Sequence, residues 1–325
     1  MSERAFRLGW WLSSEEHDPR TLVTNAVMAE AAGFETAMIS DHLQPWVRHQ
    51  GNGSFVWTVI GAIANATERL EVGTGVTAMM HRSNPVNVAQ AACTAAVMLE
   101  DRFFLGVGSG ERLNEQPFGE RWPRAGERRA QLEEAVNVIR QLFAGDKVNH
   151  RGEYWSVENL QLMTLPASPP PIFMAAGGKL SAASAGKSGD GLIGVTPDAH
   201  QIDVFRGSGG MGKPCLAQLH VSIASTMAAA LDNAWEWWPI GVLPPSVLGE
   251  LAQPEDFFAI ADAIGRDDIG EMVICATETA PVIEAIDRFA GAGFDTVYLH
   301  QVGPDQQRLA DLARTDLFPH YRQSG

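Results

Sequence analysis

Short runs of apolar residues alternate along the chain with longer segments of helical periodicity. Several runs are continuous rather than alternating, which is typical of strands covered on both faces of a parallel sheet. Their order predicts an α/β protein built from repeated strand–helix units. Eight runs can be separated: Leu8–Leu12, Thr36–Ile39, Leu70–Ala78, Phe103–Val107, Ile172–Ala176, Leu192–Val195, Leu216–Ala224 and Thr296–Leu299.

Helices are predicted between the strands from apolar spacing and from end signals. Asp18 followed by Pro19 is typical of a helix N-terminus, and Gly33 ends that helix. Gly145 ends a later helix in the same way. The apolar residues of this later helix recur at three- and four-residue spacing and define its buried face: Leu132, Val136, Ile139 and Phe143.

One strand–helix unit is present twice. Residues 32–39 and 292–299 both begin with Ala-Gly-Phe and continue into an apolar run. Each combines a helix end, a capping glycine and a strand, so the same unit occurs near both ends of the chain. Together with the eight strands, this repeat predicts a (β/α)8 TIM barrel. On the pattern alone, a doubly wound open sheet is the alternative.

Two segments exceed a minimal barrel, and we expect both near its C-terminal mouth. Residues 145–170 are rich in aromatic residues and proline. Residues 225–270 are the candidate lid or substrate wall, although packing of this segment onto the barrel explains its composition equally well. Neither segment resembles a linker, so residues 1–325 are expected to form one domain. The candidate wall contains three clustered tryptophans: Trp235, Trp237 and Trp238.

The composition is that of a soluble globular enzyme, with 45% hydrophobic and 19% charged residues. No apolar run reaches about eighteen residues, and the N-terminus lacks the apolar core of a signal peptide. We therefore expect no membrane span and a cytoplasmic location. The three cysteines lie far apart in the sequence, which favours reduced thiols over a disulfide framework. A net charge of −15 disfavours nucleic acid and membrane surfaces as partners and leaves a small molecule.

Two of the apolar runs end abruptly on ionisable residues. Asp41 and His42 follow the second predicted strand, and Glu111 follows the fourth. Catalytic groups of a barrel lie where its strands end. A histidine there titrates near neutrality and can move a proton, and a glutamate beside Trp46 would have its acid form favoured by desolvation. The alternative is a capping Asp-His pair and a solvated glutamate, but the coincidence with two strand ends favours catalysis.

Three glycine-rich segments are candidate ligand contacts. Gly73 and Gly75 interrupt a predicted strand, which indicates either a bulge beside a ligand or tight packing under a helix. Ala175–Lys179 ends a strand with two glycines before a helical run, and free amides at such a helix start bind anions. Gly106–Gly110 offers a similar backbone cradle.

Other common active sites find no support in the sequence. A metal centre needs histidine and carboxylate ligands clustered at strand ends, and the histidines are scattered. A serine nucleophile needs a Gly-x-Ser-x-Gly elbow, and residues 108–110 supply only Gly-Ser-Gly. We therefore expect neither a metal nor a serine nucleophile.

A set of motifs is distributed over nearly the whole chain: Ser40–Trp46, His49–Gly51, Gly75–Val76, Asn84–Pro85, Gly106–Glu115, Ala175–Gly178, Gly189–Ile193 and His300–Gln306. Together they resemble the luciferase-like monooxygenase superfamily. Within it, they are similar to the branch of coenzyme F420-dependent oxidoreductases related to glucose-6-phosphate dehydrogenase.

The resemblance implies a bacterial-luciferase-like barrel whose C-terminal mouth holds a deazaflavin, coenzyme F420. His42 and Glu111 would then be the acid/base pair, and Trp46 would help to stabilise the reacting state. The resemblance also implies a cis peptide bond between Gly75 and Val76 behind the ring. The cofactor-binding residues that it implies are Asp41, Gly75, Val76, Gly108, Ser109, Asn114, Ala175, Ala176, Gly177 and Gly178.

One part of the family pattern is missing. Sugar-phosphate members use cationic side chains in the later barrel, where this chain has Thr196–Asp198 and, at the place of an expected arginine, Glu271–Met272. A phosphate beside Asp198 and Glu271 would be repelled. We therefore expect that the substrate is not a sugar phosphate, and the clustered tryptophans favour an apolar or neutral organic molecule.

The leading hypothesis is an F420-dependent oxidoreductase that transfers a hydride between the deazaflavin and a small carbonyl, alcohol or activated double bond. Which of His42 and Glu111 is the base depends on the direction of transfer, which the sequence leaves open. One alternative keeps the fold and uses FMN, as a monooxygenase or reductase. Another is a flavin-binding protein that has lost catalysis. Family analogy suggests a homodimer.

Overall fold

Eight parallel strands form a closed barrel in this protein, whose structure is a computed structural model that describes residues 6–323. The pairs β1 with β12 and β9 with β10 close the ring. All eight predicted strands are confirmed, and the closed ring excludes the open-sheet alternative. The strands are β1 (Arg7–Leu12), β2 (Thr36–Ile39), β3 (Glu71–Thr74), β5 (Phe103–Gly108), β8 (Ile172–Ala175), β9 (Gly191–Gly194), β10 (Cys215–Ile223) and β12 (Thr296–Gln301).

Two short strands extend the ring near its mouth. Strand β4 (Thr77–Ala78) pairs with the end of β5, so the predicted run 70–78 is divided into two strands. Strand β11 (Ile274–Ala276) pairs with the end of β10. Strand β11 was not predicted from the sequence, because its three residues carry too little periodic signal.

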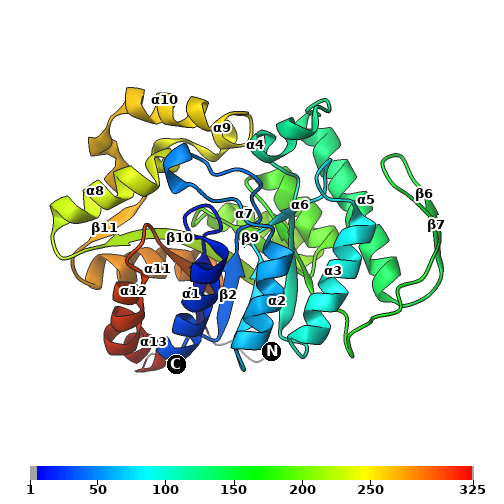
Figure 1. Ribbon diagram of the computed structural model, residues 1–325, viewed down its shortest axis with the longest axis horizontal. Helices are drawn as coiled ribbons and strands as arrows, with labels where there is room; N and C mark the ends of the chain where they lie inside the picture. Colours follow the sequence, from blue (N-terminus) through cyan, green and yellow to red (C-terminus); the bar gives the residue numbers. More distant parts are fainter. Residues whose placement is uncertain (1–5, 324–325) are drawn as a thin grey trace.

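Helices surround the barrel, and the described chain ends lie at the end of the barrel opposite to α9 and α10 (Figure 1). The helices that follow barrel strands return the chain to the next strand, as in other (β/α)8 folds. The outer helices are α1 (Pro19–Ala32), α2 (Val56–Ala66), α3 (Pro85–Met98), α5 (Ala125–Phe143), α6 (Lys179–Ser188), α7 (Ala199–Phe205), α11 (Ala280–Ala292), α12 (Gln306–Leu312) and α13 (Phe318–Gln323).

The predicted helix ends are present with the expected chemistry. The Asp18 side chain accepts hydrogen bonds from the backbone N–H groups of Arg20 and Thr21 at the start of α1. Gly33 ends α1 with φ 105°, and Gly293 ends α11 with φ 100°. Both glycines adopt the left-handed conformation that other residues disfavour. The two copies of the repeated unit are therefore the equivalent segments α1–β2 and α11–β12.

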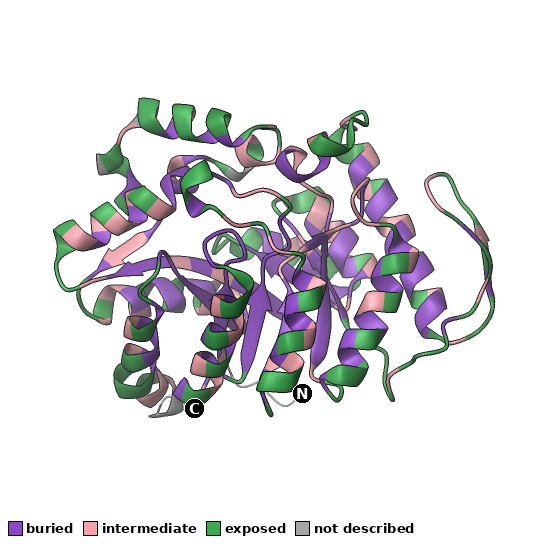
Figure 2. Cartoon of the chain, in the orientation of Figure 1, coloured by how far each residue is buried: buried purple, intermediate pink, exposed green. Residues whose placement is uncertain are grey.

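Strand residues alternate between the inside of the barrel and the helices that cover it. Leu216 packs in the inner cluster with Trp11 and Tyr298, whereas Ala217 and Leu219 pack in the outer cluster with the helices. Figure 2 shows the barrel strands buried and the outer helices exposed along one side. The alternation along β10 places Gln218 and His220 inside, with His220 nearest the carboxyl end.

Gly106 on β5 is a position where the barrel requires glycine. A Cβ atom there would collide with the backbone carbonyl oxygen of Thr74. We expect Gly106→Ala to lower the free energy of unfolding by about 2 kcal/mol or more, because backbone atoms cannot move aside. Urea unfolding measures this. Gly291→Ala is the control, since nothing lies within 4 Å of its Cβ position on α11. A Gly106→Ala variant as stable as wild type would contradict the expectation.

The two excursions differ in position, and the expectation for the first was wrong. Residues 145–170 do not reach the mouth. They form a hairpin of β6 (Val148–Arg151) and β7 (Ser156–Leu160), which lies beside α5 on the flank of the barrel (Figure 1). The Glu134 carboxylate on α5 binds the hairpin by accepting from the N–H groups of Tyr154 and Trp155. An unpaired hairpin needs such a partner, and a helix side chain supplies it.

The second excursion covers the mouth, as expected. Its helices pack with the rim in a hydrophobic cluster that includes Trp46, Trp238 and Phe257. Figure 1 shows α8, α9 and α10 at this end of the molecule, together with the short helix α4 (Arg112–Glu115). The elements of this excursion are α8 (Met227–Trp237), η4 (Pro239–Val242), α9 (Pro245–Leu248), α10 (Pro254–Ile264) and η5 (Arg266–Glu271).

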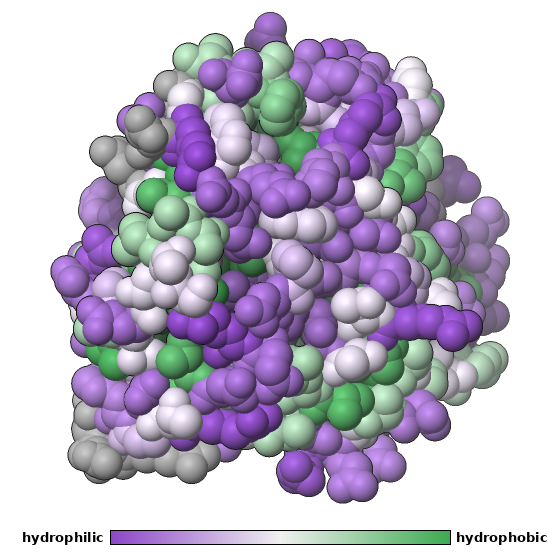
Figure 3. Space-filling view, turned by 60° about the vertical axis from the view of Figure 1, so that its left-hand side comes forward, coloured by the Kyte–Doolittle hydropathy of each residue, from purple (hydrophilic) through white to green (hydrophobic). Residues whose placement is uncertain are grey.

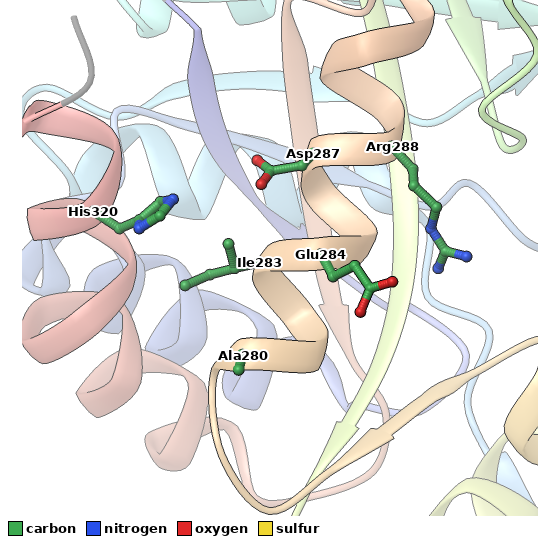
Figure 4. A pocket seen from close by; sticks show the side chains of 6 residues that line it. All are labelled: Ala280, Ile283, Glu284, Asp287, Arg288 and His320. Atoms are coloured by element: carbon green, nitrogen blue, oxygen red, sulfur yellow. The ribbon is translucent and has the colours of Figure 1, made fainter.

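The face in Figure 3 is mostly hydrophilic, with small separate hydrophobic areas. A shallow groove between α11 and α13 lies on the outer wall, away from the strand ends, and includes Asp287 and His320 among the side chains in Figure 4. None of the helices within residues 6–323 is long and apolar enough to cross a bilayer.

Candidate active site

Three loops at the barrel mouth place His42 between two carboxylates. His42 follows β2, Glu15 follows β1 and Glu111 follows β5. His42 Nε2 lies 3.2 Å from Glu111 Oε2 and 3.6 Å from Glu15 Oε1. The predicted pair of His42 and Glu111 is thus brought together. Glu15 was missed, although the rule used for the other strand ends applies to it as well.

The protonation of His42 differs from the sequence expectation. Burial by itself would lower the pKa of His42, but the Glu15 and Glu111 carboxylates outweigh burial and raise it to about 9. The expectation of titration near neutrality was therefore wrong, because it left out Glu15. In the imidazolium form, Nδ1–H donates to the backbone carbonyl of Gln44 at 3.2 Å, and Nε2–H faces Glu111.

The two carboxylates have different environments. The Glu15 side chain is buried and accepts hydrogen bonds from the hydroxyls of Ser13, Ser14 and Ser40. Burial favours its acid form, but the nearby His42 charge and the Ser40 hydroxyl lower the pKa of Glu15 overall. The Glu111 side chain is 35% exposed, so Trp46 does not wall it off from solvent.

Trp46 packs against His42 rather than enclosing Glu111. Its indole lies 4.7 Å from the His42 ring and 5.3 Å from the Phe257 ring of α10. The Gln50 side-chain oxygen accepts from the backbone N–H of Trp46. Gln50 also donates to the backbone carbonyl of Trp237 in α8. These contacts fix the Trp46 segment between His42 and the second excursion.

Asn114 and Asp41 both have protein partners in the structure. The Asn114 side-chain oxygen accepts from the backbone N–H of Leu43 at 2.9 Å, and its amide nitrogen lies 3.2 Å from His42 Nδ1. Asn114 therefore holds the loop after β2. The Asp41 carboxylate accepts from the Thr77 hydroxyl at 2.7 Å and pairs with Arg82 at 2.8 Å. A cofactor contact for either residue stays a prediction.

The segment between β3 and β4 has the predicted backbone. The Gly75–Val76 peptide bond is cis. A Cβ atom on Gly75 would lie 2.5 Å from the Met38 sulfur, and one on Gly108 would lie 2.6 Å from the Val76 side chain. Val76 packs onto the top of the inner cluster. Glycine is thus required at both positions for Val76 to reach this place. Ser109, next to Gly108, is half-buried.

Residues 175–178 form the other part of the predicted cofactor site. Ala175 ends β8, and Ala176 bonds to the backbone of β9. Nothing lies within 4 Å of the Cβ positions of Gly177 and Gly178, which precede α6. An open space beside the N-terminus of a ten-residue helix can hold an anionic group. Its use for a cofactor tail stays a prediction.

The structure describes one of the two acidic side chains expected to repel phosphate. The Asp198 carboxylate accepts from the N–H groups of His200 and Gln201, so it caps α7. The side chain of Glu271 lies outside the described residues. Among the residues that the structure describes, no group of three or more His, Cys, Asp or Glu is placed to hold a metal.

Three further polar residues at the mouth were not predicted as site residues. Glu16 follows Glu15 in the loop after β1, His220 lies near the end of β10, and His300 near the end of β12. Trp238 packs over both histidine rings at 4.8 and 4.6 Å. A signal was available for His300, which directly follows the predicted strand Thr296–Leu299, and for Glu16, which follows Leu8–Leu12 by four residues. His220 lies within the predicted strand Leu216–Ala224, so only the structure shows that its side chain is near the mouth.

Residues 5–296 match the family model of luciferase-like monooxygenases. The chain belongs to this family. It is similar to the F420-dependent glucose-6-phosphate dehydrogenase of Mycolicibacterium fortuitum, with 33% identity over 98% of this chain and 99% of the relative. The Nocardia farcinica enzyme of the same name is 34% identical over 97% of this chain and 98% of the relative. These relatives confirm the predicted resemblance to the F420-dependent branch.

Solved structures agree with this assignment. An F420-dependent secondary alcohol dehydrogenase in complex with an F420-acetone adduct superposes with a TM-score of 0.89 and 28% identity. It covers 96% of this chain and 100% of its own. The coenzyme F420-dependent tetrahydromethanopterin reductase of Methanopyrus kandleri has a TM-score of 0.76 at 20% identity, which bears on the fold alone.

Proposed function

We propose that this protein is an F420-dependent oxidoreductase that transfers a hydride between the deazaflavin and a small neutral alcohol or carbonyl compound. The main support is the position of His42, which carries a proton between two carboxylates at the mouth of the barrel. The F420-dependent relatives support the choice of cofactor.

The residues at the mouth fit a deazaflavin with an anionic tail. Gly75–Val76 offers an apolar backbone surface above the inner cluster, suited to a flat ring. The open space at Gly177 and Gly178 beside the start of α6 suits the phosphate of the tail. When bound, the deazaflavin supplies a ring carbon that accepts or donates the hydride.

The chain's own residues manage the proton. The imidazolium form of His42 holds a proton at Nε2 that can protonate a carbonyl oxygen during reduction. Glu111 lies 3.2 Å from this atom and stabilises the charge or takes the proton in the opposite direction. Trp46 packs against the His42 ring at 4.7 Å and holds the imidazole in place.

The proposed substrate class rests on the groups near the carboxyl ends of β10 and β12. His220 and His300 lie there beneath Trp238. Burial lowers the pKa of both histidines, to about 3 for His300, so both are neutral at pH 7. Neutral rings beneath an indole favour an uncharged substrate over a dianionic phosphate. Among the relatives, the secondary alcohol dehydrogenase is therefore the better guide to substrate.

A titration of the purified protein with F420 and with FMN tests the cofactor. We expect saturable binding of F420. When simple secondary alcohols are added, they should reduce the bound F420, and its absorbance should fall. Glucose 6-phosphate is the comparison substrate and should give much slower turnover. Binding of FMN alone would favour the flavin alternative, and F420 binding without turnover of any alcohol or carbonyl would favour an inactive binding protein. Either result would overturn the proposal.

A further inference from the structure

Glu16, His300 and His220 form a continuous hydrogen-bonded chain from the protein interior to the barrel mouth. His300 Nε2 lies 3.3 Å from Glu16 Oε2, and His300 Nδ1 lies 2.8 Å from His220 Nδ1. The Glu16 side chain is fully buried and that of His300 is 1% exposed, whereas His220 is half-buried. Only the last member therefore has access to a molecule in the mouth.

His300, the middle member of this hydrogen-bonded series, lies next to the proposed ring site. Trp11 on β1 packs 6.4 Å from the His300 ring and would also touch a Cβ atom on Gly75. The strand alternation directs His220 into the barrel, and Trp238 covers its ring. Glu15, which precedes Glu16, belongs to the His42 group. The loop after β1 thus supplies one carboxylate to each of two separate sets of polar residues. Glu15 contacts His42, and Glu16 contacts His300.

The hydrogen bonds that link Glu16, His300 and His220 can all point in one of two opposite directions. Two neutral histidines that share an Nδ1–Nδ1 hydrogen bond must have one donor and one acceptor. With Glu16 protonated, its O–H donates to His300 Nε2, His300 Nδ1–H donates to His220 Nδ1, and His220 Nε2–H faces the mouth as a donor. With Glu16 ionised, every bond reverses and His220 Nε2 becomes an acceptor.

The surroundings of Glu16 favour its acid form near neutral pH. Its Oε1 atom is buried with no hydrogen-bond partner, and its Oε2 accepts from the Gly303 N–H. Burial raises the pKa of Glu16 to about 8, and Glu15 adds to this while His17 opposes it. The titratable groups facing the chain are Glu15, His17 and the chain members themselves. Asp18 adjoins His17.

We propose that Glu16, His300 and His220 are a second proton path that serves the substrate oxygen at the barrel mouth, an inference that rests on the proposed function. His220 is the catalytic residue of this path. His300 and Glu16 are positioning residues that decide whether His220 Nε2 donates or accepts a hydrogen bond.

During alcohol oxidation, the substrate hydroxyl proton moves to His220 Nε2, the His220 Nδ1 proton moves to His300 Nδ1, and the His300 Nε2 proton moves to Glu16. A bound oxidised deazaflavin would supply the acceptor for the carbinol hydride, and the carbon–oxygen bond would become a carbonyl. In reduction, each transfer runs in the opposite direction. Oxidation through this path therefore requires ionised Glu16 and increases as the pH rises through about 8.

Glu16→Gln tests the path because the amide fills the same space but cannot take the proton. The Gly303 N–H directs the amide oxygen toward His300 Nε2–H, so His220 Nε2 should remain an acceptor at every pH. We expect alcohol oxidation to fall about 100-fold or more and to lose its rise near pH 8. Glu134→Gln is the control, since it alters a carboxylate–histidine pair far from the mouth. Glu134 Oε1 lies 3.0 Å from His150 Nε2 on the flank of the barrel.

Histidine nitrogen NMR of the full chain gives a readout that does not require turnover. In wild type, we expect His220 to carry its proton on Nε2 below about pH 8 and on Nδ1 above it. In Glu16→Gln, the tautomer should not change between pH 6 and 10. A His220 tautomer that is constant in wild type would overturn the proton path. A Glu16→Gln variant with a wild-type pH profile would also overturn it.

A second variant covers the case in which Glu16→Gln fails to fold. His220→Gln removes the end of the path at the mouth and leaves Glu16 buried. It should bind F420 as wild type does and lose the same rise in oxidation near pH 8. Retention of that rise would overturn the proton path. Failure of wild type to bind F420 would instead overturn the proposed function, while the NMR result would still report on the path.

Discussion

Replacing Glu111 with glutamine is expected to reduce turnover by about 10²- to 10⁴-fold, the range typical of a positioned acid or base. The amide keeps the shape of the side chain but cannot carry the charge that faces His42 Nε2 at 3.2 Å. Affinity for F420 should change little, because Glu111 faces His42 and Asn114 rather than the open space at Gly177.

Steady-state kinetics together with an F420 titration separate these two effects. Glu236→Gln is a matched control, because Glu236 forms a similar pair with His49 at 3.2 Å, with both side chains about half exposed. It should retain wild-type turnover. Full activity of Glu111→Gln would remove the role proposed for this carboxylate, and loss of F420 binding would assign Glu111 to the cofactor instead.

Replacing Glu15 with glutamine is expected to lower the pKa of His42 by about one unit or more. Glu15 is buried 3.6 Å from His42 Nε2, and its charge is a main reason why the pKa of His42 reaches about 9. In wild type, carbonyl reduction that uses the His42 proton should fall as the pH rises through about 9. In Glu15→Gln, this fall should begin at a lower pH, because the imidazolium loses a stabilising charge.

The pH dependence of reduction and the NMR titration of His42 check this prediction independently. The raised pKa of His42 also makes the stability of the fold depend on pH. The folded pKa of His42 lies above its usual value of 6.5, so its contribution to stability is complete below pH 6.5 and is lost as the pH rises through about 9. Glu15→Gln should make thermal stability less sensitive to pH across this window. An unchanged alkaline limb in the variant would contradict the role of Glu15.

Local chemistry explains why much of the fold was predictable. The eight strands were visible as apolar runs because both of their faces are buried. The ends of α1 were visible because Asp18 and Gly33 carry cap chemistry that acts within a few residues. The position of residues 145–170 was not predictable in this way. It depends on the contact of the hairpin with Glu134 on α5, which is a different element.

The sequence by itself determined the barrel, the family, and the presence of His42 and Glu111 at strand ends. Only the tertiary structure decided that Glu15 stands beside His42, because the parallel pairing of β1 with β2 brings the loops after these two strands together. It also decided the histidine protonation states, which depend on burial and on charges from distant parts of the chain. Periodicity and helix caps arise from interactions between residues close in sequence, so the sequence reveals them. Electrostatic interactions act between groups close in space, so they require the folded structure.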